Sequence, residues 1–394
     1  MVFAVLGAGN GGQAMAAYLA LQGYDVNLYN RTRERIKGVI KAGGIELNGV
    51  YKGFGKLRKI TTKMEEAIAA AEIIMVVTPA VAHQYLAREI SPFLKNGQRI
   101  VLNPGRTGGA LEFYNVLKDS GCKADVIISE AQTFLYASRI TGPAQVTVFG
   151  VKKRVAIAAF PSSRTRELVD DLFEVFPQFI PVENVLKTSL DNIGAVFHPA
   201  PTLLNMAWIE TTAGKFTYYQ QGITPSLAKI LEELDQERME VAYALGIEPL
   251  SACDWLRMSY DVKGRNLYEL IQSNYHYQDI GAPATIKHRY IFEDVPMSLV
   301  PISSLGKQFK IQTPTIDMII NLANIVYQTD FWQKGRTVDS LGLKGLSKSE
   351  ILRLVNVGVL DNVEVLPTNQ HSIYQRIDDI IYKKYPENYQ KEVE

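Results

Sequence analysis

Few side chains in this protein have the type and the surroundings that acid–base chemistry needs. The five histidines lie at positions 83, 198, 276, 288 and 371. His198 is the strongest candidate because its segment, residues 192–201, is uncharged and places Pro199 and Pro201 directly after it. A histidine titrates near neutrality and can act as a general acid or base. The alternative, a structural histidine in an apolar segment, stays open on the sequence alone.

A second polar cluster occupies residues 287–296. Here two acids, Glu293 and Asp294, follow the cations Lys287, His288 and Arg289. Charges at this density can belong to a functional site, but they also form surface ion pairs that contribute little. The cluster alone does not decide between the two.

A glycine-rich turn near the start of the chain has the spacing of a phosphate-binding turn. Gly7, Gly9 and Gly12 fit the pattern GxGxxG, with Asn10 inside it. In such a turn the first glycine permits the sharp bend, the second lets the backbone approach a pyrophosphate, and the third lets the next helix pack closely. The helix N-terminus adds unpaired N–H groups for the phosphates. The turn follows a strand and opens a helix, so it predicts a bound dinucleotide. A turn used only for packing is the alternative.

The end of the next expected strand indicates which dinucleotide would bind. NAD sites usually have an acidic residue here that accepts from the ribose hydroxyls. This chain has Asn30, followed by Arg31 and Thr32. Arginine suits a 2′-phosphate, which favours NADP as the cofactor. NAD remains the alternative, with the arginines then on a solvated face. Thr78 and Pro79, which end another strand, are expected to line the same site.

These residues need a framework that alternates strands with helices. Expected strands are residues 2–6, 25–29, 73–77, 99–102 and 125–129, with helices at 13–22, 64–71, 81–93 and 111–120. Residues 146–149 and 155–160 are expected to close the sheet. Alternation of this kind implies a parallel sheet with both faces covered. The predicted N-terminal domain is therefore an α/β Rossmann domain, a doubly wound parallel sheet.

After about residue 182 the pattern changes to helical spacing of apolar residues, as in Leu227, Leu231 and Leu234. We therefore expect a mainly α-helical C-terminal domain. The predicted division is residues 1–180 for the dinucleotide, 181–365 for substrate and catalysis, and 366–394 for a terminal helix and tail. A hinge near residues 178–190 is expected, with the active site between the two domains.

Composition excludes several classes of function. The net charge is +1, with 42 basic and 41 acidic residues, which gives no electrostatic basis for binding nucleic acid or an anionic membrane. No apolar stretch is long enough to span a bilayer. Cys122 and Cys253 form neither a disulfide framework nor a zinc pattern, and no metal site is expected. Reduced thiols and the lack of a signal peptide predict a cytoplasmic protein. The oligomeric state stays open, a homodimer included.

Several segments taken together resemble the octopine/opine dehydrogenase family. They are the glycine turn, residues 103–113, residues 130–133, residues 192–199 and residues 289–296. The resemblance covers about residues 1–365. Its last two motifs are specific, whereas the glycine turn is shared with many dehydrogenases. The resemblance implies a Rossmann domain, a helical domain and an active site between them.

The family reaction is the reductive condensation of a 2-oxo acid, such as pyruvate, with the amino group of an amino acid. By resemblance, His198 is the catalytic histidine and Asp294 the acid that pairs with it. Arg289 is the arginine near the substrate carboxylate, and Asn192 is expected to contact substrate. In such a reaction His198 would protonate the hydroxyl that leaves during imine formation, and Asp294 would hold its tautomer. The resemblance fixes neither the choice between NADP and NAD nor the amino acid.

Two other functions stay open. A 2-hydroxy acid or glycerol-3-phosphate type dehydrogenase on the same plan would use a lysine of the helical domain, with Lys187 and Lys215 as candidates. A cofactor-sensing binding protein would need the fold but no ordered group of histidine, aspartate and arginine. A large distance between His198 and Asp294 would favour the sensor.

Overall fold

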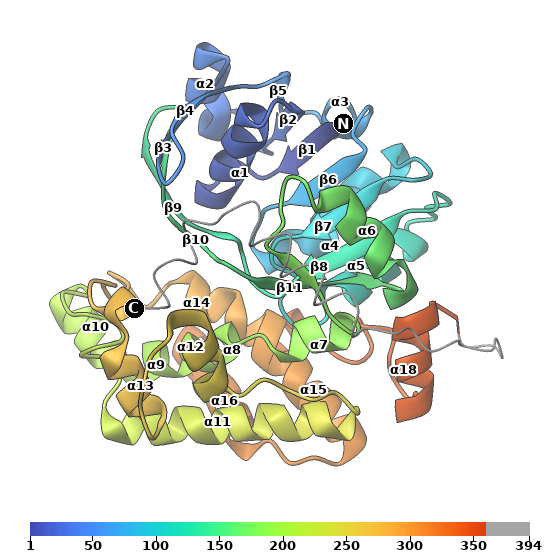
Figure 1. Cartoon of the computed structure of the whole chain (residues 1–394). Coiled ribbons are helices and arrows are strands. Elements are labelled where there is room, and N and C mark those ends of the chain that lie inside the picture. The colour runs from blue at the N-terminus through green and yellow to red at the C-terminus, as the bar shows by residue number, and fades with distance from the viewer. Residues whose placement is uncertain (360–394) are drawn as a thin grey trace, which may run out of the picture.

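The computed structural model describes residues 1–359, and the predicted terminal helix and tail at 366–394 lie outside them. Figure 1 shows a half built on a sheet above a half built of helices. The main sheet has eight strands in the order β12-β11-β8-β7-β6-β1-β2-β5. Its strands are β1 (Val2–Leu6), β2 (Asp25–Tyr29), β5 (Lys59–Thr61), β6 (Ile73–Val76), β7 (Arg99–Leu102), β8 (Ile127–Ala131), β11 (Val155–Phe160) and β12 (Phe179–Pro181).

The strand order confirms the predicted Rossmann fold. Every neighbouring pair in the main sheet is parallel except β11 with β8. The order of connection reverses at β1, which lies between β2 and β6. Open sheets of this type bind ligands outside the carboxyl ends of the strands at that switch point. Gly7 and Thr78 follow the two strands that meet there, so the sheet itself brings the glycine turn and the Thr78–Pro79 loop together.

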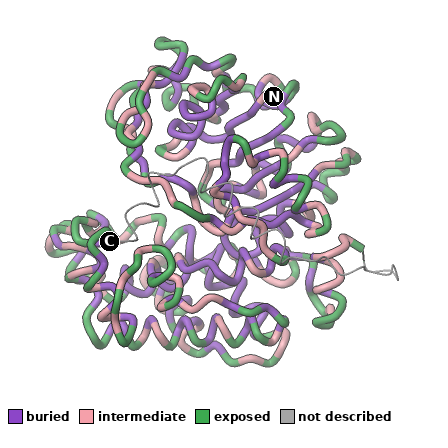
Figure 2. The backbone as a smooth tube through the Cα atoms, viewed as in Figure 1, coloured by how far each residue is buried: buried purple, intermediate pink, exposed green. Residues whose placement is uncertain are grey.

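Apolar runs account for the strands, and helices cover both faces of the sheet. Phe3, Ala4, Val5 and Leu6 of β1 are all fully buried, as a parallel strand covered on both sides requires (Figure 2). The covering helices are α1 (Asn10–Leu21), α2 (Arg33–Ala42), α3 (Met64–Ile68), η1 (Ala80–Ala82), α4 (His83–Ile90), η2 (Ser91–Phe93), α5 (Gly109–Asp119), η3 (Ser162–Arg164) and α6 (Thr165–Leu172).

One predicted strand belongs elsewhere. Residues 155–160 do join the main sheet as β11, but residues 146–149 lie in a second sheet with the order β4-β3-β10-β9. It contains β3 (Gly44–Gly49), β4 (Gly53–Lys56), β9 (Tyr136–Gly142) and β10 (Gln145–Val151). The prediction was wrong because β10 pairs in parallel with β3, far away in the sequence, and local alternation carries no information on such a partner.

The second half is helical, as predicted. From residue 182 to 359 the long elements are helices, and α11 packs against α13, α15 and α16 at the centre. None of the helices in residues 1–359 has the length and apolar character to span a membrane. The elements are α7 (Val185–Leu190), α8 (Gly194–Phe197), α9 (Pro199–Leu204), α10 (Met206–Thr212), α11 (Pro225–Ala244), α12 (Ala252–Tyr260), α13 (Leu267–Ser273), η4 (Tyr275–Tyr277), α14 (Arg289–Phe292), η5 (Val295–Leu299), α15 (Val300–Phe309), α16 (Pro314–Tyr327), α17 (Phe331–Lys334) and α18 (Lys348–Val357).

The segment expected to act as a hinge is anchored to the sheet at its second half. Helix α7 packs on β11 and β8. Thr188 and Ser189 of α7 both donate to Oε1 of the buried Glu130, at 2.7 and 2.6 Å. These contacts argue against free bending of residues 184–190.

A buried ion pair also joins the two halves. Arg336, fully buried, donates from Nε to Glu112 Oε2 of α5 at 2.7 Å. Its Nη1 donates to the carbonyl oxygens of Gly105 and Thr107, and its Nη2 lies 3.0 Å from His83 Nδ1. The guanidinium from the helical half is therefore surrounded by acceptors from the sheet half.

Replacing this arginine should destabilise the whole chain. Arg336→Met is expected to lower the free energy of unfolding by about 3–5 kcal/mol, because Glu112 would keep a buried charge without its partner. Urea unfolding followed by circular dichroism measures the change. The matched control is Arg257→Met, which breaks an exposed pair with Asp254 and should cost less than about 1 kcal/mol. Equal losses in the two variants would contradict the assigned role of Arg336.

Candidate active site

A crevice opens at the switch point of the main sheet. Its volume is about 250 Å³. Its walls come from the ends of β1, β2 and β6 and from the start of α4, where they consist of Gly7, Tyr29, Asn30, Arg31, Thr32, Arg35, Thr78, Pro79, Ala82, Tyr85 and Leu86. All five predicted cofactor residues that lie outside the glycine motif therefore line this one cavity.

The three motif glycines have the geometry that a dinucleotide turn needs. Gly7 has φ +112°, and a Cβ there would lie 2.4 Å from the carbonyl oxygen of Val77. A Cβ on Gly12 would lie 1.8 Å from the carbonyl oxygen of Gly7, so the helix could not pack so closely. Gly9 has no atom within 4 Å of that position. The space beside Gly9 and the N-terminus of α1 therefore fit a pyrophosphate.

Two predicted cofactor residues also hold the framework of the crevice. Asn30 accepts from the backbone N–H of Ala8 at 3.2 Å and donates to Thr32, which ties the glycine turn to the start of α2. The Asn10 side chain accepts from the N–H of Ile140 at 3.0 Å, and this contact directs its oxygen toward β9. Arg31 lies 5.5 Å from the ring centroid of Tyr85 and keeps its exposed guanidinium at the rim.

His198 lies at the junction of α8 and α9. Pro199 takes the first position of α9, where a missing N–H costs nothing. The carbonyl oxygen of His198 accepts from the hydroxyls of Thr202 and Tyr218, each at 2.8 Å. The ring stacks on Tyr290 with centroids 4.1 Å apart. Backbone and ring are thus held from several sides, and the side chain stays 16% exposed.

The structure brings His198 and Asp294 together, although 96 residues separate them. Nδ1 of His198 lies 2.8 Å from Oδ2 of Asp294, which is fully buried. A hydrogen bond from Nδ1–H would leave Nε2 of the ring as the nitrogen that can exchange a proton with a ligand. Asp294 precedes η5, a π-helical turn of the kind that often occurs at functional sites.

Arg106 is the central residue that the sequence did not reveal. It follows β7 at the same carboxyl edge of the sheet, with φ +60°. Its Nη1 lies 3.1 Å from Asp294 Oδ1, and its Nε donates to Glu293 Oε1 at 3.2 Å. A cation directly after a buried strand at this edge was the available signal. A left-handed conformation costs a non-glycine residue about 1–2 kcal/mol, and here the two ion pairs hold it in place.

The other two expected substrate residues differ in their placement. Arg289 on α14 is 58% exposed, and its Nε forms a loose ion pair with Glu293 Oε2 at 3.7 Å. Its guanidinium is accessible to a ligand carboxylate. Asn192 is buried; it donates to Ser298 Oγ at 2.8 Å and accepts from Arg106 at 3.5 Å. Asn192 therefore supports Arg106, and the expected contact with substrate does not fit its burial.

The charges around the pair set its protonation. Burial lowers the pKa of His198. The charges of Arg106 and Arg289 lower this pKa further, and the charge of Asp294 opposes them in part. The imidazole is therefore neutral at neutral pH. Burial alone would raise the pKa of Asp294, but the charge of Arg106, and that of His198 once acid protonates it, hold the pKa of Asp294 below its usual value. Burial disfavours the charge of Arg106, yet Asp294 and Glu293 raise its pKa above the usual value. Both ion-pair partners thus stay charged.

The two candidate lysines are poorly placed for acid–base work. Lys187 Nζ donates to the carbonyl oxygen of Glu248 at 2.7 Å and lies 2.5 Å from Asp191 Oδ2. Lys215 is exposed. Neither belongs to the His198–Asp294 constellation, which disfavours a lysine-based dehydrogenase. A large distance between His198 and Asp294 would have favoured a cofactor sensor, and the short distance observed disfavours it.

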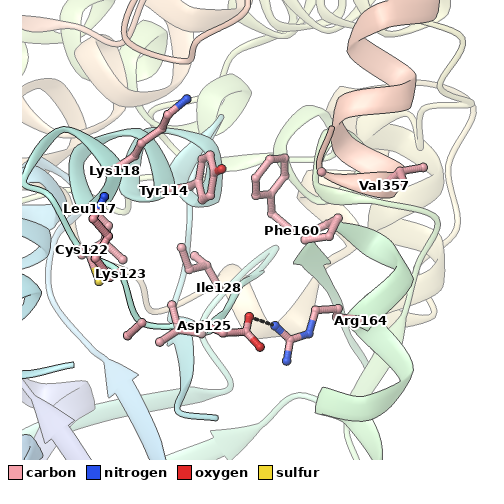
Figure 3. A pocket seen from close by; sticks show the side chains of 14 residues that line it. Tyr114, Leu117, Lys118, Cys122, Lys123, Asp125, Ile128, Phe160, Arg164 and Val357 are labelled. Carbon is pink, nitrogen blue, oxygen red and sulfur yellow. Dashed lines mark hydrogen bonds and ion pairs between the residues drawn. The ribbon is translucent and has the colours of Figure 1, made fainter. Parts of the chain in front are cut away.

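A separate cavity of about 390 Å³ lies at the other end of the main sheet, where β8 begins and β11 ends. Figure 3 shows Tyr114 and Phe160 on one of its sides and the ion pair of Asp125 with Arg164, at 2.7 Å, on another. The cofactor crevice lies at the ends of β1, β2 and β6 and shares no lining residue with this cavity, so the cavity takes no part in the site around His198.

Comparison with known proteins finds a matching family model for each half of the chain. The family model described as "NAD/NADP octopine/nopaline dehydrogenase, alpha-helical domain" matches residues 181–327. The model described as "Ketopantoate reductase PanE/ApbA" matches residues 3–103. An opine dehydrogenase from Arthrobacter sp. (strain 1C) is 40% identical over 350 residues, which cover 89% of this chain and 97% of that protein.

Two solved structures share the fold. Octopine dehydrogenase with NADH and L-arginine superposes with a TM-score of 0.75 at 20% identity, covering 93% of this chain and 100% of that one. Yersinopine dehydrogenase with NADP+ superposes with a TM-score of 0.67 at 16% identity, covering 90% and 97%. At these identities the likeness concerns the fold, and the two structures carry different cofactors.

The buried His83 next to the site should make stability depend on pH. Burial first, and then Arg336, hold the pKa of His83 well below its ordinary value of 6.5. Below about pH 6.5 the unfolded chain therefore binds a proton that the folded chain does not. Stability is complete above that pH and should fall as the pH drops, by up to about 1.4 kcal/mol per unit for this one group.

Urea unfolding between pH 8 and 5 checks this expectation. His83→Gln should show a shallower loss of stability below about pH 6.5 than the unaltered protein, because glutamine does not titrate. His198 remains in both proteins, so the difference between the two slopes isolates His83. Identical slopes on the acid side would show that His83 does not carry the effect.

Proposed function

This chain belongs to the octopine/opine dehydrogenase family of NAD(P)-dependent oxidoreductases, and from that premise we propose which reaction its site carries out. The proposed reaction is the NADPH-dependent condensation of a 2-oxo acid with the amino group of an amino acid, giving a secondary amine dicarboxylate. The observation that carries the proposal is the 2.8 Å contact of His198 with the buried Asp294. The neighbouring residue, Glu293, accepts a hydrogen bond from Ala80 in the cofactor loop, so the pair lies beside that loop.

The protonation of His198 suits the first step. An amino acid arrives as an ammonium, which cannot attack a carbonyl until it loses a proton. A neutral imidazole can accept that proton at Nε2, and Asp294 stabilises the imidazolium that forms. The same proton can then pass to the hydroxyl that leaves as water when the imine forms. NADPH, when bound, supplies the hydride that reduces the imine.

Arg289 is the proposed ligand of the 2-oxo acid carboxylate. It is exposed and adjacent to Tyr290, whose ring covers one face of His198. A guanidinium can bind a carboxylate through two parallel hydrogen bonds, which orients the carbonyl carbon as well as binding it. Pyruvate is one such acid. The amino acid partner is a second carboxylate-bearing molecule, and octopine dehydrogenase has been solved with L-arginine in that role.

A spectrophotometric screen tests the proposed reaction. NADPH oxidation is followed with pyruvate or 2-oxoglutarate against a panel of amino acids, with each substrate also supplied alone. Turnover that requires both the acid and the amine supports the proposal. Oxidation or reduction of a simple 2-hydroxy or 2-oxo acid without amine would contradict it and support the other dehydrogenase class.

The same assay examines the catalytic pair. His198→Ala should lower the rate about 10²–10⁴-fold while NADPH affinity stays nearly unchanged, since the histidine acts on the proton and not on the cofactor. Asp294→Asn should lower the rate in the same direction, and the two losses should not add because the residues act as one unit. Multiplicative losses, or unchanged turnover in His198→Ala, would show that the pair is not the catalytic unit.

The preference for NADP rests on the rim of the crevice. Arg31 and Arg35 lie on either side of Thr32, which is the N-cap residue of α2. The two arginines and the N–H groups of this helix end can bind a 2′-phosphate, and the lining of the crevice contains no acidic side chain that would repel it. Arg31→Ala should weaken NADPH binding about tenfold or more and NADH binding far less, because one charge-assisted hydrogen bond is worth about 1.5–3 kcal/mol. Cofactor titration monitored by fluorescence measures both. Equal losses, or a wild-type preference for NADH, would overturn the preference.

A further inference from the structure

We propose that Glu293 is a positioning residue that links the cofactor loop to the His198–Asp294 pair through Arg106. The inference rests on the proposed function, because the pair is taken as the proton-transfer unit. Glu293 itself is only 3% exposed and does not line the crevice. Its influence must therefore pass through the groups that it holds.

The first link runs to the cofactor side. Oε1 of Glu293 accepts from the backbone N–H of Ala80 at 3.1 Å, across 213 residues of sequence. Ala80 opens η1 directly after Thr78 and Pro79, both of which line the crevice. A carboxylate from the helical half thus holds the loop that forms one wall of the cofactor site in the sheet half.

The second link runs to the catalytic pair. The same Oε1 accepts from Arg106 Nε at 3.2 Å, while Arg106 Nη1 lies 3.1 Å from Asp294 Oδ1. Arg106 is therefore shared by two adjacent carboxylates. The three buried groups carry one net negative charge, which a protonated His198 would neutralise. Without the charge of Glu293, the buried group would be neutral and would favour the imidazolium less.

One detail separates this arrangement from an ordinary structural ion pair. Oε2 of Glu293 is buried and accepts no hydrogen bond in the described part of the chain. Arg289 Nε lies 3.7 Å from this oxygen. A purely structural carboxylate would be expected to satisfy both oxygens, as Glu130 does. A carboxylate with one oxygen outside any hydrogen bond, beside the exposed Arg289, fits a group whose negative charge acts on the neighbouring side chains.

Several other groups face the pair and must be considered in any pH dependence. Around His198 these are Asp294, Arg106, Arg289 and His288, with the phenols of Tyr290 and Tyr218. Around Glu293 they are Arg106, Asp294, Arg289 and His83. All of them remain in a variant at position 293, so a change in the pH profile reports the one charge that was removed.

Two substitutions separate the two links. Glu293→Gln removes the charge but keeps an oxygen for Ala80, so the limb of the pH profile of kcat/KM that reports His198 should move to lower pH by about one unit. Glu293→Asp keeps the charge in the buried group but shortens the reach of Oε1 by one methylene, so that limb should move much less than in the glutamine variant. The aspartate variant should instead bind NADPH several-fold to tenfold more weakly, since the loop loses its anchor.

Glu112→Gln is the matched control, because Glu112 is a buried carboxylate that pairs with Arg336 instead of Arg106. It should lose stability without moving the pH limb. Direct titration of the His198 ring by NMR, and NADPH binding by fluorescence, give both readouts without turnover. They therefore test Glu293 even if the proposed condensation is not observed.

A lowered His198 pKa in Glu293→Gln and weakened NADPH binding in Glu293→Asp would support the proposal. An unmoved His198 pKa in the glutamine variant would overturn the charge link, and unchanged NADPH affinity in the aspartate variant would overturn the loop link. Failure of Glu293→Gln to fold, while Glu112→Gln folds, would assign Glu293 to folding and overturn the proposal as a whole.

Discussion

A guanidinium almost cut off from water holds the active site of this protein together. Arg106 is 7% exposed and lies against two carboxylates, one of which also contacts the catalytic candidate His198. Removing a buried ion from water costs several kcal/mol, and only close partners can offset that cost. Arg106 therefore requires Glu293 and Asp294 at close range, and they in turn require Arg106. This mutual requirement fixes η5 of the helical half against the loop after β7.

The carboxyl edge of the main sheet explains why so many functional groups converge. Parallel strands end at the same edge, so the residues that follow them share one neighbourhood whatever their distance in sequence. Gly7, Asn30, Thr78, Arg106 and Glu130 each end or follow a different strand there. The sheet supplies the cofactor crevice and one cation, while the helical half supplies the histidine and both acids. Neither half contains a complete site.

Local pattern was enough to determine the Rossmann framework, the glycine turn, the helical second half and most strands. These features depend on the alternation of apolar residues and on glycines at fixed offsets, which act over a few residues. The family resemblance added His198, Asp294 and Arg289 as candidates, and the structure places the first two in contact. It buries Asn192 against Ser298 and Arg106, where the side chain supports its neighbours, so a contact with substrate stays a prediction that this burial disfavours.

Only the tertiary structure decided which residues that are distant in the sequence come into contact. The pairing of β10 with β3, the burial of Arg106 between Glu293 and Asp294, and the insertion of Arg336 beside His83 all join residues 99 or more positions apart. No periodicity carries that information, because the free energy of a buried charge depends on what the whole fold packs around it. The sequence determined which residues could do the chemistry. The packing of the two halves decided that two buried arginines, Arg106 and Arg336, would join them.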